Sequence, residues 1–176
     1  MRRRRRARLA AAAPGRSRGG LTSKIHLAID TARRPLAVIV TAGQAKDSPR
    51  FIPVLDKVRV RGPAGRPRTR PGAVAADKAH SSAANRAYLR RRGIKAVICR
   101  PRDQAANRKR KGSGGGRPLT CDPGLYRERN TAERGINKIK AWRGPATRYD
   151  KDPANHRAGL ELRAALLWIR SLQAKP

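Results

Sequence analysis

The chain has 176 residues, with 44 Lys or Arg against 11 Asp or Glu and a formal net charge of +33. So large an excess of cations opposes compaction unless a polyanion offsets it, and it indicates a nucleic-acid partner whose binding weakens steeply with salt. Aromatic residues make up only 3%, which argues against recognition of single strands by stacking on bases. Double-stranded DNA is the expected partner, although GC-rich coding also enriches Arg, Ala, Gly and Pro.

Length and composition also narrow the class of protein. The chain is long enough for one domain with a modest core, and no apolar run approaches the length of a membrane span. Residues 1–14 combine an Arg run with an apolar part too short for a secretory signal, so we expect a basic disordered tail there. Cys99 and Cys121 are interpreted as reduced thiols. The expected location is cytoplasmic and nucleoid-associated, with no membrane partner.

The first predicted elements are a β-hairpin and a helix. Apolar residues alternate over 23–29, a turn follows, and an apolar run covers 36–40. Ser48 at the N-cap and Pro49 in the first turn predict a helix start. Residues 59–72 are rich in Arg, Gly and Pro and predict an exposed basic loop.

The middle of the chain predicts a parallel crossover unit. A short apolar strand over 73–76, a helix that stops at Gly93 and a strand over 94–99 fit within about thirty residues. Residues 102–119 carry a run of Lys and Arg followed by glycines, and they predict a second basic loop that is disordered until phosphate binds. The expected fold class is therefore α/β.

Two helices are predicted at the C-terminal side, over about 123–142 and 154–172. The second has apolar residues at helical spacing. The side chains expected in its core-facing stripe are Leu160, Leu162, Leu166, Leu167, Ile169 and Leu172.

The helix predicted over 123–142 carries a distinctive set of polar side chains. Steps of three, four and seven residues place Tyr126, Arg129, Glu133 and Lys140 on one helical face. A carboxylate among cations can bind a divalent metal while its neighbours hold phosphates. The alternative is an ordinary solvated helix in which Arg129 and Glu133 form an i,i+4 ion pair.

This spacing resembles the motif around the last catalytic acid of DDE transposases from bacterial insertion sequences. Further stretches resemble the insertion-sequence-five group of that family, and together they cover about residues 15 to 172. These stretches are residues 15–30, Gly43-Gln44 with Asp47-Ser48, residues 75–80 and residues 107–110.

The resemblance implies a ribonuclease H-like fold and metal-dependent phosphoryl transfer that cuts element ends and joins them to target DNA. Asp77 and Glu133 would be catalytic acids and would bind Mg²⁺ or Mn²⁺. The side chains that would position DNA near the metals are Tyr126, Arg129 and Lys140. Other transposase subunits are the further partners implied. For Asp77 the alternative role is a helix cap or a partner of Lys78.

The sequence also differs from the family pattern that it resembles. Its first catalytic aspartate lies on a strand before the segment that begins at Gly15, and residues 1–14 contain no Asp or Glu. We therefore expect a partial domain over 15–172 that lacks the first strand and the first acid, followed by a tail at 173–176. Asp30 and Asp47 are assigned turn or cap roles.

Three functional hypotheses remain at this point. The first is a DDE transposase, or its C-terminal portion, acting on duplex DNA with a divalent metal. The second is a non-catalytic DNA-binding remnant, whose binding would survive loss of Asp77 and Glu133. The third is an unrelated RNA-binding basic protein, which would prefer structured RNA over DNA at matched salt.

Overall fold

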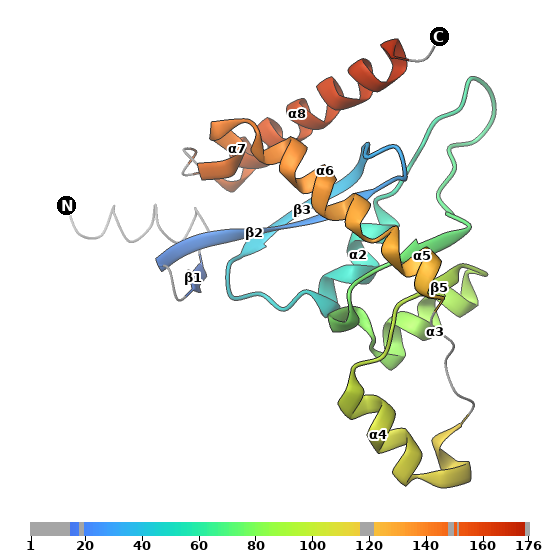
Figure 1. The fold of residues 1–176 in the computed structure, drawn as a ribbon. Helices are drawn as coiled ribbons and strands as arrows, with labels where there is room; N and C mark the ends of the chain where they lie inside the picture. Colours follow the sequence, from blue (N-terminus) through green and yellow to red (C-terminus); the bar gives the residue numbers. More distant parts are fainter. Residues whose placement is uncertain (1–14, 18–19, 117–121, 148–149, 151, 175–176) are drawn as a thin grey trace.

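The fold is taken from a computed structural model of the chain (Figure 1). The residues it describes are 15–17, 20–116, 122–147, 150 and 152–174. The basic tail predicted over residues 1–14 lies outside them.

The predicted hairpin is confirmed. Strands β2 (Gly20–Ile29) and β3 (Pro35–Ala42) pair antiparallel, and β1 (Gly15–Ser17) pairs with the start of β2 on its other side. The turn depends on Asp30, whose carboxylate accepts hydrogen bonds from the Arg34 backbone N (2.8 Å) and Nε (2.6 Å). The turn role assigned to Asp30 is therefore confirmed.

Helices cover both faces of this hairpin because side chains alternate between the faces of a strand. Helices α6 (Asn130–Lys140) and α8 (Pro153–Gln173) lie on one face, and α2 (Phe51–Asp56) packs on the other. The first face is held by a buried cluster of Val38, Ile139, Leu160 and Leu167. The second is held by Ala37, Val54 and Val58. The result is three layers, helix on sheet on helix.

A short 3₁₀ helix, η1 (Ser48–Arg50), leads into α2, as Ser48 and Pro49 predict. The N-cap position belongs to Asp47, however, and Ser48 lies inside the helix. The Asp47 side chain makes no capping hydrogen bond and pairs with Lys24 instead.

The parallel crossover is also confirmed. Strands β4 (Ala73–Ala75) and β5 (Lys95–Val97) pair parallel and are joined through η2 (Lys78–His80) and α3 (Ala83–Arg91). They form a sheet separate from the hairpin, and α2 and α3 share one core cluster with the flanks of β5. The side chains of β4 are exposed or only partly buried.

The two predicted basic loops differ in outcome. Residues 59–72 form an irregular segment with one isolated bridge between Val60 and Arg68. Residues 102–119 do not form a loop throughout, because helix α4 (Arg102–Arg110) and the 3₁₀ helix η3 (Gly112–Gly115) occupy most of the segment. Figure 1 shows α4 projecting away from the three-layer body.

The helix predicted over 123–142 is divided in the structure. Helix α5 (Pro123–Arg127) and α6 are followed by the short α7 (Arg143–Thr147). Asp122 caps α5 by accepting hydrogen bonds from the backbone N of Gly124 (3.0 Å) and Leu125 (3.2 Å).

Helix α8 confirms the final predicted helix but corrects its core. Leu160 and Leu167 are buried, whereas Leu162, Ile169 and Leu172 are among the exposed large hydrophobic residues. Only one side of α8 packs on the sheet, so the leucines on its other side remain exposed. Among the helices that the structure describes, none combines the length and apolar character needed to cross a bilayer.

One cysteine expectation is wrong. Cys99 is disulfide-bonded in the structure, whereas the sequence interpretation made it a reduced thiol. Cys121 lies outside the described residues.

Candidate active site

Asp77 lies just beyond the C-terminal end of β4 and begins η2. One of its oxygens, Oδ1, accepts a hydrogen bond from the Lys78 backbone N (2.7 Å), so its role as a cap is confirmed. The carboxylate is nevertheless 58% exposed. Capping a single 3₁₀ turn therefore leaves most of this side chain accessible to a ligand.

The junction between α5 and α6 brings Tyr126 and Arg129 together. The backbone N of Glu128 bonds to the Leu125 carbonyl (3.2 Å) and that of Arg129 to the Tyr126 carbonyl (3.1 Å), which is the tighter 3₁₀ pattern. Side chains three residues apart eclipse in such a turn. The Arg129 guanidinium accordingly lies 5.5 Å from the centre of the Tyr126 ring, a cation–π distance.

Arg129 joins the two predicted catalytic acids. Its Nη1 lies 3.6 Å from Asp77 Oδ1, and its Nη2 lies 3.3 Å from Glu133 Oε1. The i,i+4 pair between Arg129 and Glu133 that is expected for an ordinary helix is therefore present. The same guanidinium also contacts Asp77, which follows strand β4 of the parallel sheet. The structure thus brings Asp77, Tyr126, Arg129 and Glu133 together.

Lys140 is not part of this group. It is exposed in the last turn of α6, seven residues beyond Glu133, which is about 10 Å along the helix axis. Among the described residues, the structure shows no contact between its side chain and the other three motif residues.

A neighbouring polar cluster was not predicted. Asp47 Oδ1 lies 3.3 Å from Lys24 Nζ and 3.5 Å from His26 Nδ1. Burial lowers the pKa of His26 and of His80, and the charge of Asp47 opposes that shift in both. Asp77 acts on the His80 pKa in the same direction as Asp47, so this cluster borders the candidate site. Asp47 and His80 lie far in the sequence from Lys24 and His26, and no spacing pattern could have revealed that they meet.

The donor chemistry of Asp77 and Glu133 fits a divalent cation. Carboxylate oxygens are the ligands that Mg²⁺ prefers, both side chains are more than half exposed, and the two already face one cationic group, the Arg129 guanidinium. Within the described part of the chain, no group of three or more His, Cys, Asp or Glu side chains is arranged to hold a metal ion. Among the residues that the structure describes, Asp77 and Glu133 are the acids whose carboxylates contact the Arg129 guanidinium.

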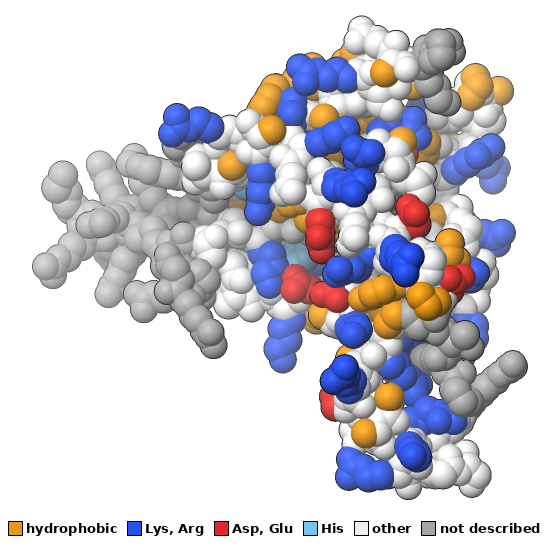
Figure 2. Space-filling model, in the orientation of Figure 1, with side chains coloured by type: hydrophobic (Ala, Val, Ile, Leu, Met, Phe, Trp, Pro, Cys, Tyr) orange, Lys and Arg blue, Asp and Glu red, His pale blue; other side chains and the backbone are white. Residues whose placement is uncertain are grey.

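The surrounding surface is strongly basic. Figure 2 shows acidic side chains gathered near the middle of one face, with Lys and Arg around them and over the projecting α4. Such a field attracts polyanions toward the acidic group.

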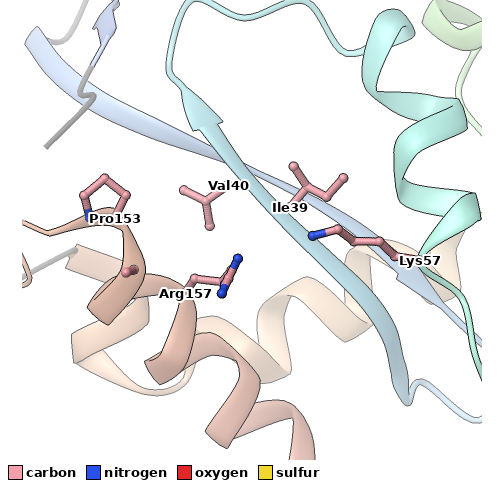
Figure 3. Close-up of a pocket in the computed structure, with 6 residues that line it drawn as sticks. Ile39, Val40, Lys57, Pro153 and Arg157 are labelled. Atoms are coloured by element: carbon pink, nitrogen blue, oxygen red, sulfur yellow. The ribbon is translucent and has the colours of Figure 1, made fainter. Parts of the chain in front are cut away.

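A cavity of about 270 Å³ lies elsewhere, between β3, Lys57 and the start of α8 (Figure 3). None of its lining residues belongs to the candidate site. They are Ile39, Val40, Lys57, Pro153, Ala154 and Arg157.

Comparison with known proteins identifies the family. A family model described as "Transposase DDE domain" matches residues 3–168. A protein of Burkholderia cepacia, named as a transposase for insertion sequence element IS402, is 31% identical over 152 residues. That match covers 86% of this chain and 64% of the relative, so the chain spans less than two thirds of the relative's length. No solved structure matches the chain significantly. The chain belongs to the family of transposase DDE domains.

Proposed function

We propose that this chain acts on double-stranded DNA in transposition, by metal-dependent phosphoryl transfer that cleaves and joins DNA strands. The observation that carries the proposal is the Arg129 guanidinium, which contacts the carboxylates of both Asp77 and Glu133 (3.6 and 3.3 Å). Family membership supports the class of reaction.

Asp77 and Glu133 are the residues that would hold Mg²⁺ or Mn²⁺. When bound, such ions activate the attacking oxygen and stabilise the leaving oxygen of an in-line displacement at phosphorus. The chain's own cations would hold the DNA. Arg129, which contacts Tyr126 and both acids, would contact a phosphate of the DNA. Lys140, two turns further along α6, would contact a phosphate outside the site.

We also propose a ribonuclease H-like arrangement over residues 15–172. Two features support this arrangement. These are the antiparallel hairpin of β2 and β3 and the parallel crossover from β4 to β5 that follows it. The partners proposed are duplex element ends, target DNA and other transposase subunits, and the proposed location is the nucleoid.

The test is nicking of a duplex that carries the element's terminal DNA, with Mg²⁺ or Mn²⁺. We expect cleavage that is lost in Asp77→Asn and in Glu133→Gln. The matched control is Glu161→Gln, because Glu161 is also an exposed helical carboxylate paired with an arginine at i−4. Cleavage that survives both site substitutions would contradict the proposal.

A second candidate is a DNA-binding protein that does not cleave. It is favoured by the ion pairs of the acids near the hairpin, which leave these acids less available as a third metal ligand. Asp30 pairs with Arg34, and Asp47 pairs with Lys24 and His26. This candidate predicts salt-sensitive DNA binding by the wild type and by both site variants, with no metal-dependent cleavage by any of them.

A further inference from the structure

Residues 102–116 form a projecting segment, here called the basic arm, which comprises α4 and η3. Within residues 102–111 there are five Lys or Arg against one Asp. No residue of α4 is buried. An isolated helix of this length is only marginally stable in water. Packing against a hydrophobic core therefore does not explain why α4 forms.

Specific hydrogen bonds and close packing nevertheless fix the conformation of the basic arm. The Arg108 guanidinium donates to the Gly116 carbonyl from Nε (2.9 Å) and Nη2 (2.6 Å), which folds η3 back onto α4. Gly115 packs so closely that an added Cβ would lie 2.3 Å from the Arg108 carbonyl oxygen. Gly112 and Gly116 have φ of 54° and 68°, where glycine is favoured. The glycines therefore shape the arm as a defined element.

One face of α4 carries cations separated only by small side chains. Arg102 and Lys109 are seven residues apart and so lie on the same side of the helix, about 10 Å apart along its axis. Ala105 and Ala106 lie between them, and all four residues are exposed. Small side chains let a duplex approach the helix closely, and the spacing is close to the width of a DNA major groove, about 12 Å.

The base of the arm is joined to the segment that carries Asp77. Gln104 Oε1 accepts a hydrogen bond from Ser81 Oγ (3.3 Å), directly after η2. Arg86 fixes Ser81 in turn, donating to its Oγ (2.8 Å) and to the Ile98 carbonyl (2.7 Å). A duplex held on the arm would therefore be positioned relative to the candidate active site.

We propose that the basic arm is a second binding site for duplex DNA, in which Arg102 and Lys109 contact phosphates on either side of a groove, independently of base sequence. This inference rests on the proposed function only for its partner, duplex DNA. The arm requires no cleavage chemistry, and charge complementarity with the phosphate backbone selects the occupant.

The experiment measures duplex binding against salt concentration in the Glu133→Gln background, without divalent metal, so that cleavage plays no part. In the double variant Arg102→Gln/Lys109→Gln, we expect the slope of log K against log salt to become less steep by about 2, for two lost phosphate contacts. Affinity should fall similarly for unrelated DNA sequences. The matched control is Lys57→Gln/Arg157→Gln, which removes the same charge at the cavity of Figure 3.

The expected result is a large change in the arm variant and a small one in the control. Equal changes of the salt slope in the arm variant and in the control would show that DNA binding depends only on net charge, and this result would overturn the proposal. A second readout is amide hydrogen exchange over residues 102–110, which should slow on adding duplex DNA. Unchanged exchange there, or arm-dependent binding to structured RNA but not to duplex DNA, would also overturn it.

Discussion

Asp77 and Glu133, which come from different elements, meet through one guanidinium. Arg129 reaches both carboxylates at 3.6 and 3.3 Å while its guanidinium lies over the Tyr126 ring. Both carboxylates are more than half exposed, and exposed ion pairs contribute little to stability. We therefore propose that the arrangement serves the proposed binding of DNA and metal rather than the stability of the fold.

Replacing Arg129 by Gln tests that explanation. Because both carboxylates are more than half exposed, we expect the free energy of unfolding to fall by no more than about 1 kcal/mol. DNA binding and metal-dependent cleavage should fall far more, because the phosphate contact is lost. Urea denaturation and nicking assays on the same protein separate the two effects. A loss of stability large enough to explain the loss of activity would contradict the account.

The contact between α6 and β2 depends on a glycine. A Cβ at Gly135 would lie 2.3 Å from Ile29 Cδ1. Gly135→Ala should therefore destabilise the protein by about 1 kcal/mol or more, although alanine favours the helix.

Shortening the opposing side chain should relieve that clash. In Ile29→Val/Gly135→Ala, the cost of the alanine should largely disappear, and a double-mutant cycle by urea denaturation measures the coupling. Additive effects would mean that α6 does not pack on β2 at this point.

Acid should destabilise the fold through His26, which is buried, and His80, which is partly buried. Burial lowers the pKa of His26 and His80 below the ordinary value of 6.5. Below that value the unfolded chain binds protons that the folded chain does not, so stability falls as the pH drops from 6.5 through the lowered values. Unfolding measured at pH 7.5 and 5.5 should show this loss, and His26→Gln should reduce it. An equal loss in the variant would exclude His26 as a source.

Arg163 is a buried cation with a structural role. Its Nε and Nη2 donate to the Lys138 carbonyl (3.1 and 2.9 Å), and its guanidinium lies 4.9 Å from the centre of the Trp142 ring. Arg163→Leu should cost about 2 kcal/mol, because a carbonyl near the end of α6 loses its charged donor. The control is Arg157→Leu on the exposed side of α8, which should cost less than about 0.5 kcal/mol. Similar costs for both, by urea denaturation, would contradict this role.

Local patterns predicted the elements well where one physical signal dominated. Alternation over 23–29 identified β2, and Gly93 ended the crossover helix at a φ of 64°. The apolar stripe of α8 was misread because periodicity marks apolar side chains but not which of them find a partner. The sheet covers only one side of α8, so Leu160 is buried while Leu162 is 58% exposed.

The candidate site was only partly predictable. Spacing placed Tyr126, Arg129 and Glu133 together, and the structure confirms those contacts. The contact between Arg129 and Asp77 depends on tertiary packing, which the spacing of residues in the sequence does not reveal. The segment over 102–110 was misread because its Gly-rich, basic composition is typical of loops, whereas the Arg108 hydrogen bonds to Gly116 stabilise a helix and a return turn.

Binding of Mn²⁺, followed by electron paramagnetic resonance in the wild type, in Asp77→Asn, in Glu133→Gln and in the double variant, tests the central claim most directly. If the two carboxylates form one site, each single substitution should weaken binding by a similar factor, and the double variant should lose less than the sum of the two effects. Binding that is unchanged in either single variant would show that Asp77 and Glu133 do not share a metal.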